Sequence, residues 1–144
     1  MAGLCHDLGH GPFSHVFDNE LLPRLGITDF HHEDMSGLLF DRALERALPE
    51  SDELQLIEAE DPMAFRLVKD MIANGKGKGD QRASAPAGRR YLFDIVSNTT
   101  NSIDVDKFDY ILRDAYYTGV KVAFEHKPVT ATMQVGDVLY HVDD

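Results

Sequence analysis

Three histidines and an aspartate lie close together near the start of the chain, in the stretch CHDLGHGPFSH at residues 5–15. Neutral imidazole is a ligand for transition metals, whereas carboxylate also binds harder ions. The adjacent His6 and Asp7 would point about 100° apart on a helix, yet both can reach one ion at its flank. The pair therefore indicates a site for Mn, Fe, Zn or Mg. By itself it is a weak signal, because such dipeptides are common.

The residues after this pair add further imidazoles and a second carboxylate. Glycine and proline at residues 9–12 favour a sharp end to the first helix, which places His10 on a loop beside the His-Asp pair. His15 and Asp18 are three residues apart and can meet on the next helix, where the carboxylate would orient the imidazole as a proton donor. The alternative is a surface histidine paired with an acid. His32 indicates a role only in the company of the earlier histidines.

The stretch SIDVDKFDYILRD at residues 102–114 is the second group of chemically capable side chains. Asp106, Tyr110 and Asp114 recur every four residues, so a helix would place them on one face, with Lys107 beside them. Together they can bind a metal, neutralise a phosphate and hydrogen-bond to a sugar. The alternative is an exposed helix held by charge pairs, with an apolar face formed by Phe108, Ile111 and Leu112.

Helices are expected to position most of these groups. Apolar spacing predicts helices over residues 13–25 (broken at Pro23), 33–48, 52 to about 59, from 61 onward, 91–96 and from 103 to Gly119. Asp104 is expected to cap the last helix and Gly119 to end it. The 33–48 helix is expected to bury one apolar face, formed by Met35, Leu38, Leu39, Ala43, Leu44 and Leu48.

Two segments differ from this helical pattern. Residues 74–90 combine glycine and basic residues without a large apolar side chain, which is typical of a flexible insertion rather than of a phosphate contact. The tail is rich in valine and threonine, as short β-strands are, with a turn at Gly136 and Asp137. The predicted fold class is therefore mostly α, with short β-strands near the C-terminus.

Composition sets the broad class of the protein. The 144 residues suffice for one domain, and the net charge of −11 argues against broad binding to nucleic-acid backbones. Acidity still permits a small phosphorylated substrate held by a metal or a locally positive pocket. No apolar run is long enough to span a membrane, no secretory signal is visible, and Cys5 has no disulfide partner in the chain. We therefore expect an intracellular protein, nuclear or cytoplasmic.

Three segments in this order, CHDLGHGPFSHVFD, HHEDMSG and YLFDIVSNTTNSIDVDKFDYILRDAYYTG, resemble the HD-domain phosphohydrolases. The similarity is closest to the deoxynucleoside triphosphate triphosphohydrolases of the sterile-alpha-motif-and-HD-domain type. It runs from about residue 2 to residue 126, interrupted by residues 74–90. The resemblance implies a helical HD fold over part of a domain at residues 1–126, followed by a short β-rich tail at residues 127–144.

The same resemblance implies a role for each matching residue. The metal ligands would be His6, Asp7 and Asp106. The group that protonates the leaving group and contacts the α-phosphate would be His10, His15, Asp18 and His32. The residues that hold the triphosphate, the sugar and its 3′-hydroxyl would be Lys107, Tyr110 and Asp114. The implied reaction is metal-dependent hydrolysis of a dNTP to deoxynucleoside and inorganic triphosphate.

The chain also departs from the family pattern. The family's first metal-ligand histidine lies upstream of the His-Asp pair, on a helix that these residues do not include. We therefore expect weaker metal binding and impaired turnover. Allosteric nucleotide sites and a tetramer are not implied, and a homo-oligomer stays open. The alternatives are an HD remnant that binds nucleotides or partners without turnover, and an HD phosphohydrolase with another nucleotide substrate.

Overall fold

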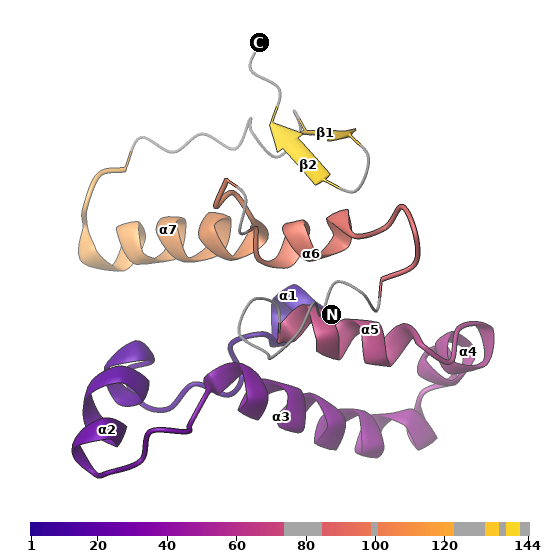
Figure 1. Ribbon diagram of the computed structural model, residues 1–144, viewed down its shortest axis with the longest axis horizontal. Helices are drawn as coiled ribbons and strands as arrows, with labels where there is room; N and C mark the ends of the chain where they lie inside the picture. The colour runs from indigo at the N-terminus through magenta and orange to yellow at the C-terminus, as the bar shows by residue number, and fades with distance from the viewer. Residues whose placement is uncertain (74–84, 99–100, 123–131, 136–137, 142–144) are drawn as a thin grey trace. The chain divides into compact units, whose positions relative to one another are not determined.

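A computed structural model describes residues 1–73, 85–98, 101–122, 132–135 and 138–141 (Figure 1). The chain divides into two compact units, residues 1–81 and 82–144, and each is described by itself. The division falls inside the predicted 74–90 insertion, most of which lies outside the described residues. Among the described residues no helix combines the length and apolar character needed to cross a membrane.

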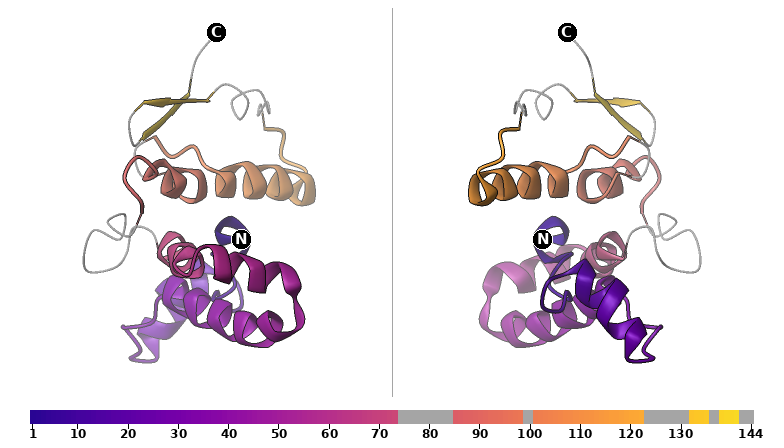
Figure 2. Two further views of the ribbon diagram at one scale, coloured as in Figure 1. Left: turned by 90° about the vertical axis from the view of Figure 1, so that its right-hand side faces the viewer. Right: turned by 90° about the vertical axis from the view of Figure 1, so that its left-hand side faces the viewer.

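The first unit is helical (Figures 1 and 2). Its elements are α1 (Ala2–Cys5), a π-helical turn (Phe17–Leu21), α2 (Leu22–Arg24), α3 (His32–Ala47), a 3₁₀ turn (Leu48–Glu50), α4 (Asp52–Glu60) and α5 (Ala64–Ile72). Helix α5 packs against both α1 and α3. The helices predicted over 33–48, from 52 and from 61 are confirmed, with ends shifted by only a few residues.

The predicted helix over residues 13–25 is only partly correct. Phe13 and Ser14 have φ angles of 68° and 51°, which are incompatible with a right-handed helix. The regular turns therefore start later, and a π-helical turn leads into α2. Pro23 does not break the helix as expected. It lies in the first turn of α2, where its missing N–H is not needed.

The apolar face predicted for the 33–48 helix is also partly wrong. The residues of α3 that are buried are His32, Ser36 and Phe40, each four positions from the next. Leu38 and Leu39 are instead 54% and 40% exposed. The buried stripe contains a histidine and a serine because the segment that carries His6 and His10 packs on the first turns of α3, as described below.

The second unit contains α6 (Tyr91–Val96), α7 (Val105–Thr118), β1 (Thr132–Val135) and β2 (Val138–His141). The two strands pair antiparallel, with Thr132 opposite His141 and Val135 opposite Val138. The predicted turn at residues 136–137 lies outside the described residues. Helix α6 packs against α7 and β2. Helices account for most of the described secondary structure, so the predicted mostly α class is confirmed.

Both predicted ends of α7 are confirmed. The Asp104 carboxylate accepts a hydrogen bond from the Lys107 N–H at 3.0 Å through Oδ1, and from the Asn98 N–H at 2.8 Å through Oδ2. Gly119 takes the left-handed conformation, with φ 69°, that ends many helices. Asp104 therefore fixes the start of α7 and ties it to the end of α6.

Candidate functional site

His6 and Asp7 lie at the end of α1 and fit a metal site. The Nδ1–H group of His6 donates to the Gly3 carbonyl at 2.9 Å, which leaves Nε2 as the electron-pair donor of the ring. His6 Nε2 lies 3.3 Å from Asp7 Oδ1, a separation that two neighbouring ligand atoms of one ion can have. Metal-binding histidines commonly donate their other N–H to a backbone carbonyl in this way. The residues present therefore fit a divalent metal.

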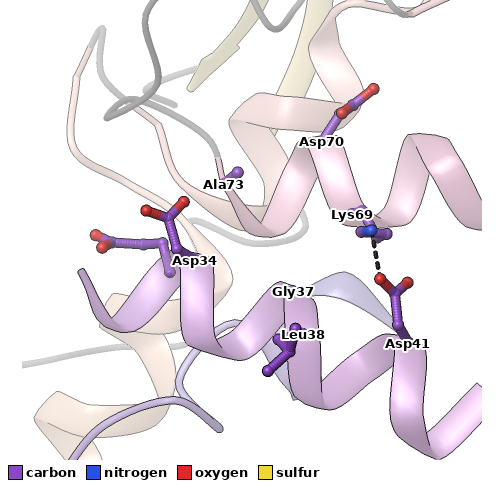
Figure 3. Close-up of a pocket in the computed structure, with 8 residues that line it drawn as sticks. Asp34, Gly37, Leu38, Asp41, Lys69, Asp70 and Ala73 are labelled. Atoms are coloured by element: carbon purple, nitrogen blue, oxygen red, sulfur yellow. Dashed lines mark hydrogen bonds and ion pairs between the residues drawn. The ribbon is translucent and has the colours of Figure 1, made fainter. Parts of the chain in front are cut away.

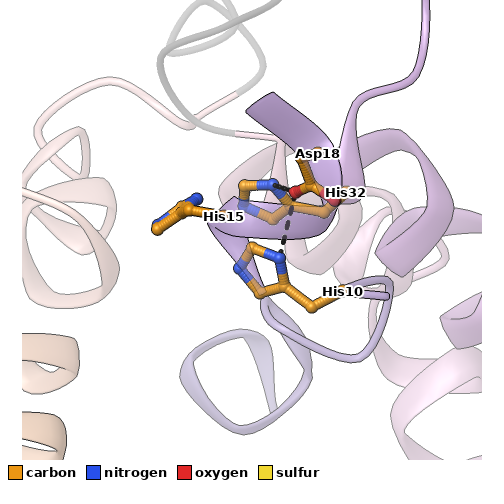
Figure 4. Close-up of side chains that lie close together, drawn as sticks. All are labelled: His10, His15, Asp18 and His32. Atoms are coloured by element: carbon orange, nitrogen blue, oxygen red, sulfur yellow. Dashed lines mark hydrogen bonds and ion pairs between the residues drawn. The ribbon is translucent and has the colours of Figure 1, made fainter. Parts of the chain in front are cut away.

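A second cluster joins three segments of the first unit around Asp18 (Figure 4). Asp18 Oδ2 lies 3.1 Å from His10 Nδ1 and 2.9 Å from His32 Nδ1. The two imidazoles stack with their centroids 3.7 Å apart, and the three side chains are at most 11% exposed. Because a carboxylate only accepts hydrogen bonds, Asp18 fixes both rings with the proton on Nδ1.

The Nε2 atoms of these two rings face other carboxylates. His10 Nε2 lies 3.5 Å from Asp7 Oδ1, and His32 Nε2 lies 3.2 Å from Glu33 Oε1. Asp7 therefore contacts the imidazoles of both His6 and His10, which places the predicted metal pair and the histidine cluster side by side. No sequence pattern had assigned a role to Glu33, although it directly follows His32 in the chain.

His15 does not pair with Asp18 as predicted. Its exposed ring stands edge-on to the other two, with centroids 4.8 Å from His10 and 5.4 Å from His32. The expected pairing assumed three-residue spacing on a regular helix. The helix starts only after the left-handed Ser14 and continues as a wider π-turn, so the Asp18 carboxylate contacts His32, at the start of α3, instead.

Gly9 and Ser36 hold the histidine-bearing loop on α3, and sequence reasoning missed them both. The Gly9 N–H donates to Ser36 Oγ at 2.8 Å, and Ser36 Oγ donates to the His6 carbonyl at 2.6 Å. A Cβ atom on Gly9 would lie 2.1 Å from the His32 carbonyl oxygen, so only glycine permits this approach. The available signal was a glycine between two histidines and a serine one helical turn after His32.

The remaining predicted site residues lie on α7, in the second unit. Asp106, Tyr110 and Asp114 occupy one face of this helix at four-residue spacing, as predicted, with Lys107 beside them. Asp106, Lys107 and Tyr110 are half-buried, whereas Asp114 is exposed and lies 3.7 Å from Arg113 Nε. The arrangement offers carboxylate, ammonium and phenol groups in one row.

A pocket of about 280 Å³ lies between α3 and α5 (Figure 3). Glu33, Asp34, Asp41 and Asp70 line it, and its single cation, Lys69, pairs with Asp41 at 2.5 Å. Such a surplus of carboxylates repels a phosphate group. The pocket is therefore not the site for a triphosphate. Its connection to the histidine cluster is Glu33, which contacts His32.

Known proteins resemble this chain over most of its length. It is 40% identical over 83% of its residues to the Dictyostelium discoideum homologue of deoxynucleoside triphosphate triphosphohydrolase SAMHD1, and 35% identical over 88% to the human SAMHD1 enzyme. It is also 41% identical over 80% of its length to an HD domain-containing protein of Acanthamoeba polyphaga mimivirus. No protein-family model matches the chain.

These alignments cover only part of each relative. The chain spans 20% of the Dictyostelium protein and 21% of the human and viral ones. The matched relatives share the HD name or the SAMHD1 type, and the resemblance noted in the sequence is to the same group. The chain belongs to the HD-domain phosphohydrolase family, and within it is similar to the SAMHD1 type.

Proposed function

We propose that residues 1–126 supply part of the active site of a metal-dependent phosphohydrolase that converts a dNTP to deoxynucleoside and inorganic triphosphate. The observation that carries this proposal is the adjacency of a metal-competent pair, His6 and Asp7, to the imidazoles that Asp18 orients. A hydrolase of phosphate esters needs these two groups together, because one activates water and the other handles the leaving group.

His6, Asp7 and Asp106 are the proposed metal ligands. A divalent ion bound there would polarise a phosphoryl oxygen and make water a better nucleophile. Carboxylate and imidazole together suit Mn, Fe, Zn or Mg, and the donor set does not choose among them. His6 is preset for this role because the Gly3 carbonyl holds its ring with Nε2 as the donor atom.

The histidine cluster is proposed to act on the α-phosphate. His10 and His32 have buried, fixed rings, which suits hydrogen bonding to phosphate oxygens in one geometry. His15 is exposed and has no printed carboxylate partner, so its ring can approach the departing 5′-oxygen and give it a proton.

The row on α7 is proposed to bind the rest of the nucleotide. Lys107 would neutralise the triphosphate, Tyr110 would lie against the sugar, and Asp114 would accept a hydrogen bond from the 3′-hydroxyl. Asp104 serves this row indirectly, since it fixes where the helix begins and therefore which side chains share a face.

The test is incubation of the chain with each dNTP and Mn²⁺ or Mg²⁺, scored for inorganic triphosphate. We expect release that disappears in Asp106→Ala and His15→Ala and persists in His31→Ala, a matched control because His31 is the exposed histidine just before α3. Absence of release, with dNTP binding retained in equilibrium dialysis, would instead support a nucleotide-binding module. Release from ribonucleotides alone would favour another HD phosphohydrolase.

A further inference from the structure

The cluster around Asp18 contains more donor atoms than phosphate binding requires. His10, His15, Asp18 and His32 each offer one ligand atom within 4.8 Å of all the others. Three imidazoles and one carboxylate form a donor set that zinc and similar borderline transition metals prefer. We propose that these four residues form a second transition-metal site, of the Zn²⁺ class, distinct from the site at His6, Asp7 and Asp106.

The distances around Asp18 already match a coordination sphere. Bonds of about 2.0–2.1 Å at tetrahedral angles place neighbouring ligand atoms roughly 3.3 Å apart. Asp18 Oδ2 lies 3.1 Å from His10 Nδ1 and 2.9 Å from His32 Nδ1. An ion that takes the place of the two bridging hydrogens would therefore need little movement of these three side chains. His15 is the exposed member, so its ring can rotate to supply the fourth ligand.

Two further carboxylates stand where a metal-bound form of the cluster would need them. An ion on Nδ1 moves the ring proton to Nε2, so no proton has to leave either neutral imidazole. That proton meets Asp7 Oδ1, 3.5 Å from His10 Nε2, and Glu33 Oε1, 3.2 Å from His32 Nε2. Metal-bound histidines typically donate their second N–H to a carboxylate in this way.

Asp18 also has capacity to spare. Its side chain is 6% exposed, and its second oxygen, Oδ1, is buried without a hydrogen-bond partner among the described residues. A buried carboxylate oxygen without a donor carries a desolvation cost that a cation would remove. Hydrogen bonding within the cluster does not account for this atom, whereas metal binding does.

The experiment uses Co²⁺ as a spectroscopic probe of the full chain. Asp106→Ala provides a background in which the first site has lost a ligand. In that background we expect one equivalent of Co²⁺ with the intense visible absorption of tetrahedral coordination, displaced by Zn²⁺. His32→Ala and Asp18→Asn should each abolish the absorption, and His31→Ala should leave it unchanged. Circular dichroism of each variant establishes that it is folded.

Glu33→Gln adds a gentler variant that preserves size. It should keep the stoichiometry of one and weaken Co²⁺ binding by roughly 10–100-fold, the usual effect of losing such a supporting carboxylate. Absorption that survives both His32→Ala and Asp18→Asn in the folded background would overturn the second site. Turnover of a dNTP does not enter this measurement, so its failure and that of the proposed function are distinguishable.

Discussion

Ser36 and His6 are joined by a hydrogen bond of 2.6 Å, from the Ser36 hydroxyl to the His6 carbonyl, thirty residues apart in sequence. The same hydroxyl accepts the Gly9 N–H at 2.8 Å. One fully buried oxygen on α3 thus fastens the backbone that carries the proposed metal pair. The chemistry of the histidine motif therefore depends on a residue outside it.

Ser36→Ala should destabilise the protein and loosen the metal pair. It removes both hydrogen bonds at a buried position, so we expect a loss of about 1–3 kcal/mol in the free energy of unfolding, measured with urea. Ser51→Ala is the control, since it removes an N-cap of α4, at a cost of about 1 kcal/mol, without contacting the site. Equal Mn²⁺ affinity in both variants would contradict a role for Ser36 in the site.

Two glycines of the first unit should respond to alanine in opposite directions. A Cβ at Gly9 meets the His32 carbonyl at 2.1 Å and the Ser36 nitrogen at 2.4 Å, both of them backbone atoms. We expect Gly9→Ala to cost about 1–3 kcal/mol or more, because the loop must lift from α3. Gly37 lies inside α3 with its nearest neighbour, the flexible Lys69 side chain, 4.0 Å away. Gly37→Ala should therefore stabilise by about 0.5–1 kcal/mol, and thermal unfolding compares the two.

Asp104→Ala should weaken the start of α7. The substitution removes a helix cap worth about 1–2 kcal/mol, together with the acceptor of the Asn98 N–H. Asp109→Ala is a matched control on the same helix, because its exposed pair with Arg113 contributes about 0.5 kcal/mol or less. Urea denaturation should separate the two variants, and equal midpoints would show that Asp104 does not fix the helix start.

Glu53 provides a test of electrostatics at the first turn of α4. Hydrogen bonding to its own backbone N–H and to the Ser51 hydroxyl lowers the pKa of this exposed carboxyl. A lowered folded-state pKa stabilises the protein above the unfolded pKa, and this contribution is lost as the pH falls through the folded value. In Ser51→Ala the pKa of Glu53 should rise toward its ordinary value while staying below it, because the backbone contribution remains. Carbon-detected NMR titration measures both values, and an unchanged pKa would contradict the Ser51 contribution.

The sequence by itself predicted the features that local interactions determine. The positions of α3, α4 and α7, the Asp104 cap, the Gly119 end and the row of Asp106, Tyr110 and Asp114 all follow from residues within a few positions of one another. The motifs of histidine and aspartate also sufficed to indicate the family. Helix geometry and capping are short-range, so periodicity carries this information.

Only the tertiary structure decided which groups the histidines and carboxylates contact. Asp18 was expected beside His15, yet it holds His10 and His32, because the left-handed residues Phe13 and Ser14 redirect the chain before the π-turn. The buried face of α3 was expected to be leucine-rich, yet it contains Ser36, because a glycine loop packs there at a distance no side chain would allow. Both outcomes depend on contacts between residues far apart in sequence, and helical periodicity carries no information about such contacts.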